Sequence, residues 1–94
     1  MPVINRKYPG KTDAEIYARV DQVMEDVARR HSLAYRRDAA AMAGSVSLLG
    51  ASGAYAVKGG QVTIELKYPM LVPGSMRRKV EEDIERKLDG LFAA

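Results

Sequence analysis

The sequence has no cysteine, no tryptophan and a single histidine, His31. Without cysteine the chain can form neither a disulfide nor a thiolate metal site. No set of carboxylates at metal-ligand spacing accompanies His31, so we expect no metal site and no cofactor.

Long apolar runs are missing as well. No stretch approaches the ~18 consecutive apolar residues of a membrane-spanning helix, and the opening segment MPVINRKYPG lacks the apolar centre of a signal peptide. The pattern predicts a cytoplasmic protein without a transmembrane segment.

No catalytic motif is present either. The serines have no histidine at a suggestive position, no G-x-S-x-G occurs, and no glycine run leads into the Lys-Ser/Thr of a phosphate loop. The carboxylates are concentrated near the C-terminus, each with a cation one helical turn away, and exposed pairs of this kind make poor general acids or bases. We expect a protein that is not an enzyme, with only a cavity catalyst lacking recognisable residues left open.

What the chain has is the composition of a folded domain. Of its 94 residues, 47% are apolar and 29% are charged, which predicts one globular domain over residues 1–94. A chain this short buries only about 60–65% of its unfolded surface, so a homodimer is a plausible supplement to its stability. The formal charge of +3 permits an anionic partner without requiring one.

The first half predicts a strand followed by a helix. Residues 2–8 suit a short strand, and the segment TDAE forms a capping box in which the Thr12 hydroxyl accepts from the Glu15 amide. His31 falls in the last turn of the helix, where a cation complements the helix dipole. The apolar stripe at helical spacing is Ile16, Val20, Val23 and Val27.

Strands dominate the middle of the chain. SLAYRR (32–37) alternates as a strand, whereas residues 39–44 are ambiguous between strand, helix and loop. Three more strands are predicted at 44–50, 53–58 and 61–68, with GASG and KGGQ as the hairpin turns between them.

The C-terminal segment predicts a second amphipathic helix capped by Ser75 and ending near Leu88 or Leu91. Its apolar stripe is Met76, Val80, Ile84, Leu88 and Leu91. Its outer face offers i,i+4 ion pairs, namely Arg78–Glu82, Lys79–Asp83, Glu82–Arg86 and Asp83–Lys87.

The order β-α-β-β-β-β-α predicts an α+β fold with a largely antiparallel sheet of about five strands. We expect the two helices to cover one face of this sheet. The other face is either solvated or a dimer contact, and it carries Ser45, Ser47, Thr63, Glu65 and Lys67.

The most informative stretch is YPMLVPGSMRRK, residues 68–79, where an apolar loop precedes three cations. Cations in the first turn of a helix oppose its dipole, which hints that Arg77, Arg78 and Lys79 meet something negative. The apolar residues either pack under the sheet edge or form an exposed contact with a cationic rim. The candidate binding surface is Tyr68, Met70, Leu71, Val72, Arg77, Arg78 and Lys79.

Nucleic-acid binding is the weaker alternative for the basic groups. Arginine pairs at 29–30 and 36–37 are interleaved with Tyr35, Tyr55 and Tyr68, as in some RNA-binding sheets, but the aromatic–glycine signatures of those sheets are absent. Tyrosines in register with aliphatic strand residues are more typical of a core.

Several segments together carry a family resemblance over nearly the full length. VINRKY, SLAY, GASGAYAV, VTIEL and the closing ML and KVEEDIERKLD resemble the polyhydroxyalkanoic acid system proteins, a family of small polyhydroxyalkanoate granule-associated chains. The resemblance implies a non-enzymatic accessory protein that acts at the granule surface or on a granule protein, and it brings no catalytic residues. A pocket for a small acyl or hydroxyacyl ligand remains an alternative of a different class.

Overall fold

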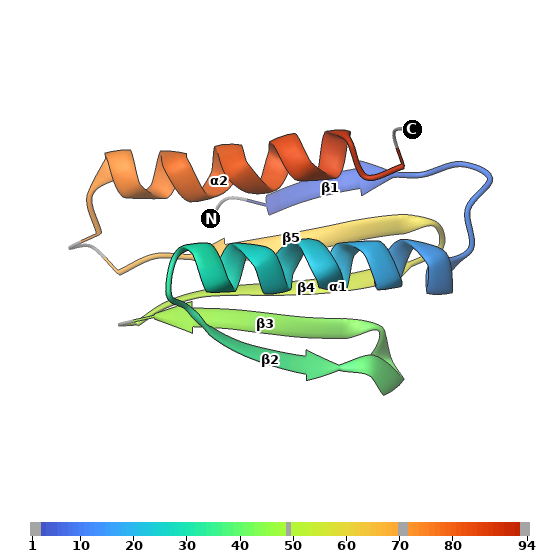
Figure 1. The fold of residues 1–94 in the computed structure, drawn as a ribbon, viewed down its shortest axis with the longest axis horizontal. Coiled ribbons are helices and arrows are strands. Elements are labelled where there is room, and N and C mark those ends of the chain that lie inside the picture. The colour runs from blue at the N-terminus through green and yellow to red at the C-terminus, as the bar shows by residue number, and fades with distance from the viewer. Residues whose placement is uncertain (1–2, 49, 70–71, 93–94) are drawn as a thin grey trace.

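The chain folds into a five-stranded antiparallel sheet with two helices on one face, an α+β architecture (Figure 1). The computed structural model describes residues 3–48, 50–69 and 72–92. The predicted fold class and element order are confirmed. The elements are β1 (Val3–Lys7), α1 (Asp13–Arg30), β2 (Ala34–Asp38), the 3-10 helix η1 (Ala39–Ala41), β3 (Ala43–Leu48), β4 (Ala51–Lys58), β5 (Gln61–Lys67) and α2 (Gly74–Asp89).

The strands lie in the order β1-β5-β4-β3-β2, so the N-terminal strand pairs with the last strand of the chain. The other neighbours are consecutive in sequence and antiparallel. Between β4 and β5, Lys58 pairs with Gln61, and both intervening glycines have positive φ, 61° and 76°. This confirms KGGQ as a tight hairpin turn.

The other predicted turn, GASG, is wrong in part. Of its residues only Gly50, at φ 88°, lies outside the strands, because Leu48 already pairs with Ala51 and β4 begins there. Gly53 is a buried strand residue, and a Cβ on it would lie 2.9 Å from Leu66 Cδ2 and 3.3 Å from Val46 Cγ2. Close packing from both neighbouring strands, and not a turn, requires glycine at this position.

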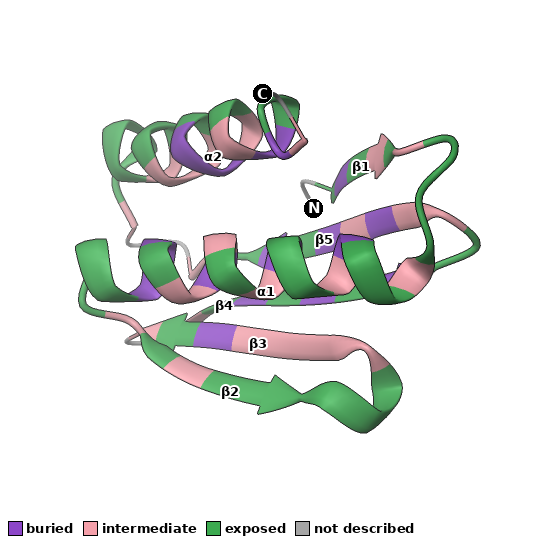
Figure 2. Cartoon of the chain, turned by 45° about the vertical axis from the view of Figure 1, so that its right-hand side comes forward, coloured by how far each residue is buried: buried purple, intermediate pink, exposed green. Residues whose placement is uncertain are grey.

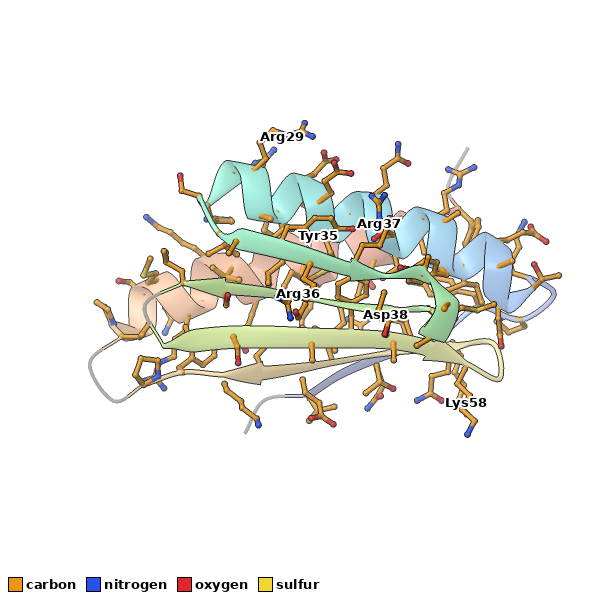
Figure 3. The ribbon with its side chains drawn as sticks, turned by 90° about the horizontal axis from the view of Figure 1, so that it is seen from below. Arg29, Tyr35, Arg36, Arg37, Asp38 and Lys58 are labelled. Carbon is orange, nitrogen blue, oxygen red and sulfur yellow. The ribbon has the colours of Figure 1, made fainter. Side chains whose placement is uncertain are left out.

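Alternation gives the sheet one buried face and one open face. In β2, Tyr35 and Arg37 point toward α1, whereas Arg36 and Asp38 lie on the opposite side with Lys58 (Figure 3). No element among the described residues covers that second face. The inward residues of β4 and β5 form the floor of the core, namely Gly53, Tyr55, Val57, Val62, Ile64 and Leu66.

Helix α1 follows its predicted pattern closely. The Thr12 hydroxyl accepts a hydrogen bond from the Glu15 amide at 3.1 Å, which confirms the predicted N-cap. Asp13 in the first turn accepts from the amides of Gly59 and Gly60, at 3.2 and 2.7 Å, and so attaches the helix to the β4–β5 turn. The buried positions are Ile16, Val20, Met24, Val27 and Ala28, with Val23 half-buried.

The start of α2 differs from the prediction. The helix begins at Gly74 with Pro73 as its N-cap residue, and no side chain accepts a hydrogen bond there. Ser75 therefore lies inside the first turn and caps nothing, because the extended backbone of Pro73 (φ −60°, ψ 143°) ends the preceding loop two residues earlier than expected.

The predicted buried and exposed faces of α2 are also wrong in part. Asp83, expected on the solvent face, is only 4% exposed because that side of the helix packs toward α1. None of the four predicted i,i+4 ion pairs forms, and Asp83 is bonded to Arg86 and to Arg30 of α1 instead. Met76, expected in the buried stripe, is 43% exposed.

The ambiguous segment 39–44 contains both a short helix and a strand start. Asp38 accepts a hydrogen bond from the Ala41 amide at 3.4 Å, which closes η1. Met42 then takes the left-handed conformation (φ 50°) and turns the chain into β3 at Ala43.

Candidate binding pocket

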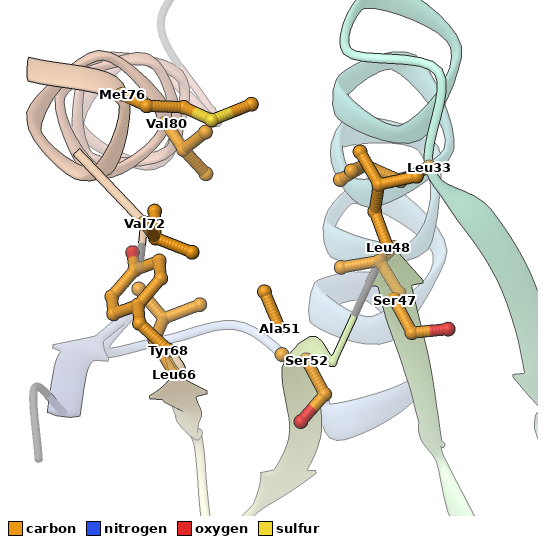
Figure 4. Close-up of a pocket in the computed structure, with 12 residues that line it drawn as sticks. Leu33, Ser47, Leu48, Ala51, Ser52, Leu66, Tyr68, Val72, Met76 and Val80 are labelled. Atoms are coloured by element: carbon orange, nitrogen blue, oxygen red, sulfur yellow. The ribbon is translucent and has the colours of Figure 1, made fainter. Parts of the chain in front are cut away.

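An apolar pocket of about 110 Å³ opens at the end of the sheet where α1 ends and α2 begins (Figure 4). Its floor is the inner face of the central strands, and its sides come from the segments that enter and leave the helices. The lining residues are Leu33, Val46, Ser47, Leu48, Ala51, Ser52, Gly53, Leu66, Tyr68, Val72, Met76 and Val80.

The pocket exists because the inward residues of β4 are small at this end of the strand. Along β4 the inner face reads Ala51, Gly53, Tyr55 and Val57, so side-chain volume is missing at the first two positions. The Tyr55 ring fills the next position and lies against Gly44 of the neighbouring strand. Side chains therefore fill the inner face of β4 from Tyr55 onward, whereas the space over Ala51 and Gly53 is left open.

Two walls face each other across this space. Figure 4 shows Val72, Met76 and Val80 on the α2 side and Leu33 and Leu48 on the opposite side. The first turn of α2 is coloured as exposed in Figure 2, whereas buried positions follow farther along the helix. The apolar wall at Met76 is consequently continuous with an exposed surface.

Polar groups at the rim are bonded to one another. The Tyr68 hydroxyl donates to Glu81 Oε2 at 3.1 Å, and burial, followed by the charge of Glu81, raises the pKa of that phenol above its usual range. The Arg77 guanidinium donates to the Val72 carbonyl at 3.2 and 3.3 Å and lies 5.3 Å from the centre of the Tyr68 ring. Arg77 therefore stabilises the chain before α2.

The structure separates the residues of the predicted binding surface. Tyr68 and Val72 line the pocket, and Met70 and Leu71 lie outside the described residues. Arg77 is half-buried, whereas Arg78 and Lys79 are exposed and take part in none of the ion pairs among the described residues.

Sequence reasoning missed most of the lining. Met76 and Val80 were assigned to the core, and GASG was interpreted as a turn, although Ala51 and Gly53 are inward positions of β4. The available signal was the run of small residues in phase with the inward tyrosine at 55. Such a run indicates missing volume on the inner face of a strand.

A charged bridge joins the two helices beside the pocket. Asp83 of α2 accepts a hydrogen bond from Arg30 of α1 at 3.2 Å and another from Arg86. His31 Nε2 lies 3.5 Å from Asp83 Oδ2. Burial by itself would raise the pKa of Asp83, but the positive charges of Lys87 and Arg30 and the contacts with Arg86 and His31 outweigh it, so the pKa is lowered.

Sequence position brings this bridge to the walls of the pocket. His31 is two residues before Leu33, and Asp83 is three residues after Val80, so each end of the bridge is close in sequence to one wall. His31, predicted as a cation in the last turn of α1, is its C-cap residue.

A second polar cluster links α1 to the strands of the sheet. The hydroxyls of Tyr35 and Tyr55 both donate to Asp21 Oδ1, and Arg37 Nε lies 2.8 Å from Asp21 Oδ2. Burial, aided by these hydrogen bonds, raises the pKa of Tyr55 strongly. Each of these four side chains is hydrogen-bonded or ion-paired to another of the four, so the cluster joins β2 and β4 to α1.

The part of the chain that the structure describes offers neither a metal centre nor a membrane-spanning helix. Within residues 3–48, 50–69 and 72–92, no three His, Asp or Glu side chains gather closely enough to hold a metal ion. In the same ranges, no helix combines the length and the apolarity needed to cross a membrane.

Comparison with known proteins gives one family. The family model described as "Putative polyhydroxyalkanoic acid system protein" matches residues 6–92, a range that contains every residue lining the pocket. No curated protein matches the chain.

Proposed function

The chain belongs to the family of putative polyhydroxyalkanoic acid system proteins, as its resemblance predicted, and from this premise we propose that it is a non-enzymatic accessory protein that docks on the surface of polyhydroxyalkanoate granules. The observation that carries the proposal is the exposed thioether of Met76 at the mouth of an apolar pocket, beside exposed cations. A polyester surface with an anionic boundary complements both features.

Helical geometry decides which cation acts with Met76. At about 100° per residue, Lys79 lies ~60° from Met76 around the helix axis, whereas Arg78 lies ~160° away. Lys79 therefore flanks the apolar contact, and Arg78 contributes mainly long-range attraction. The docking surface consists of Val72, Met76 and Lys79, with Arg78 behind it.

The magnitudes indicate a weak, reversible contact. Burying the exposed part of Met76 contributes about 1 kcal/mol, and each cation near an anionic surface contributes another ~1 kcal/mol. A sum of about 3 kcal/mol corresponds to a dissociation constant in the millimolar range or weaker. Stable docking therefore requires either many copies on one granule or a further apolar contact.

Nucleic-acid binding is disfavoured by the positions of the tyrosines. Tyr55 is 2% exposed, and its hydroxyl is bonded to Asp21. Tyr35 is half-buried in the same cluster. Rings held in this way cannot stack on bases.

Co-sedimentation with isolated granules tests the proposal. We expect Met76→Asp to reduce the bound fraction at least tenfold, because an added carboxylate opposes both the apolar and the cationic contacts. Val3→Asp is the matched control, since Val3 is, among the described residues, the other large exposed hydrophobic residue (49%) and lies on the open face of the sheet.

The pattern of loss identifies the surface. Retained binding by Met76→Asp would contradict the proposal, and loss confined to Val3→Asp would transfer docking to the open face of the sheet. Granules stripped of protein by protease distinguish the polymer surface from a granule protein, because only the polymer survives that treatment. Dimerisation through the open face remains a prediction, which analytical ultracentrifugation can test.

A further inference from the structure

The volume of the pocket limits what can enter it. An apolar protein cavity of about 150 Å³ stays dry and takes up benzene, which has six carbons. By proportion, the 110 Å³ of this pocket suit about four carbons. A long lipid tail is therefore excluded from complete burial, whereas a short alkyl group fits.

The lining points to an uncharged occupant. No charged side chain lines the pocket among the described residues, and the guanidinium of Arg77 is bonded to the carbonyl of Val72, a lining residue. Of the three lining hydroxyls, that of Tyr68 is bonded to Glu81. Ser47 and Ser52 occupy exposed positions that alternate with the inward ones (Figure 4). A carboxylate buried inside the pocket would have no positioned partner, so we expect only an uncharged group to enter.

The mouth of the pocket coincides with the docking surface. Val72 and Met76 belong to both, so a surface brought against Met76 is in position to insert a group between α2 and Leu48. Such insertion supplies the further apolar contact that stable docking requires, because the contacts of Met76 and the cations are weak. Each methylene buried in this way strengthens binding about fourfold.

From volume, charge and position we infer that the pocket binds one alkyl side chain of about four carbons borne on a neutral hydroxyalkanoate polyester, with the ester backbone remaining outside. The inference rests on the proposed docking function and names the group that is recognised. It makes the side-chain length of the polymer a determinant of affinity.

Soluble probes test this directly. Hydroxyalkanoate dimers with both ends capped as esters, carrying methyl, propyl or heptyl side chains, are titrated into the protein and followed by methyl NMR. We expect the propyl dimer to bind roughly tenfold more tightly than the methyl dimer, with shifts at Leu48, Leu66 and Val80, and the heptyl dimer to gain no more than the about fourfold of one further buried methylene over propyl.

Two variants change the volume in opposite directions. Ala51→Leu fills most of the space and should abolish the preference for propyl without lowering the thermal midpoint. Leu48→Ala enlarges the pocket and should move the optimum to a longer side chain. If Ala51→Leu fails to fold, the direction in which Leu48→Ala shifts the optimal side-chain length still tests the inference.

Contrary results are equally specific. Equal affinity for all side chains, unchanged binding by Ala51→Leu, or no shift of the optimum in Leu48→Ala would each overturn the inference. Tighter binding of the uncapped hydroxyacids than of the capped dimers would also overturn it and assign the pocket to a soluble acid.

Co-sedimentation of the same variants separates this inference from the docking proposal. If Ala51→Leu binds granules as the wild type does while Met76→Asp does not, docking stands and side-chain insertion fails. If the wild type binds the propyl dimer but not granules, the pocket specificity stands and granule docking fails.

Discussion

Arg30 at the end of α1 donates a hydrogen bond to the buried carboxylate of Asp83 on α2, with 3.2 Å between Nη1 and Oδ1. This bond crosses the interface between the two helices beside the mouth of the pocket. Leu33 and Val80, which line the pocket, lie three residues after Arg30 and three residues before Asp83 in the sequence.

We expect Asp83→Asn to lower the free energy of unfolding by about 1–3 kcal/mol at neutral pH, since the variant loses hydrogen bonds to charged partners at a site 4% exposed. The thermal midpoint should fall by roughly 4–8 °C per kcal/mol. Differential scanning calorimetry measures this, and Glu82→Gln is the control because Glu82 is the exposed neighbour. Equal losses in both variants would show that the bridge contributes nothing specific.

The pH dependence of Asp83 has a definite sign. Its pKa in the folded protein lies below the ordinary 3.8, so its contribution is present above that pH and is lost as the pH falls toward the folded-state value. The difference in thermal midpoint between wild type and Asp83→Asn should therefore shrink below about pH 4. A difference that grows in acid would refute the assigned role.

A second prediction concerns the tyrosine cluster. Tyr55→Phe removes a hydroxyl that donates to Asp21 at 2.8 Å, and we expect a loss of about 1–2 kcal/mol. Tyr17→Phe is the matched comparison, since the Tyr17 hydroxyl donates to the uncharged carbonyl of Ala43 at 2.9 Å. The loss there should be smaller, and urea titration of both variants compares them.

The same cluster predicts alkaline behaviour. Burial raises the pKa of Tyr55 above the ordinary 10.0, so folding favours the neutral phenol. The stability it contributes is full below about pH 10 and is lost as the pH rises further. Absorbance of phenolate should show Tyr55 ionising only together with unfolding, and its titration in the intact fold would contradict this.

The glycines give a third prediction, with opposite signs at two sites. At Gly44 an added Cβ would lie 2.8 Å from Cε1 of Tyr55 and closer still to the Cζ and hydroxyl, so Gly44→Ala must displace a buried ring and should destabilise by about 1–3 kcal/mol. Gly74, the first residue of α2, has open space around it. Gly74→Ala should stabilise by about 0.4–1 kcal/mol through the unfolded state. Equal effects at both sites would show that the Tyr55 contact is not the cause.

These glycines also show how far sequence alone could reach. Helical and strand periodicity depends on local spacing, which is why α1, the inward residues of β5 and the KGGQ turn were predicted correctly. Whether a glycine serves a turn or a close contact depends on the neighbouring strand. Gly53 was therefore assigned to a turn, although its contacts are Val46 and Leu66.

Asp83 was misjudged for a related reason. An i,i+4 pattern describes a helix surface as if nothing packed on it, and the charges at 79, 83 and 87 satisfy that pattern equally well. The side on which α1 lies is a tertiary property, and it buries the carboxylate at 83. The sequence left a small-ligand pocket as an alternative but could not give its lining, because the volume arises from residues of five separate segments that only the fold brings together.

The last prediction concerns the cations of α2. Since Lys79 lies on the same side of the helix as Met76 and Arg78 on the opposite side, Lys79→Glu should weaken granule binding about tenfold, whereas Arg78→Glu should weaken it less than about threefold. Lys58→Glu is the control for net charge, since Lys58 is exposed on the open face of the sheet at the other end of β4 from the pocket (Figure 3). Raising the salt from ~0.05 M to ~0.5 M shortens the screening length and should reduce the difference between Lys79→Glu and the wild type. Equal losses in all three variants would mean that overall charge, and not this surface, attracts the protein to the granule.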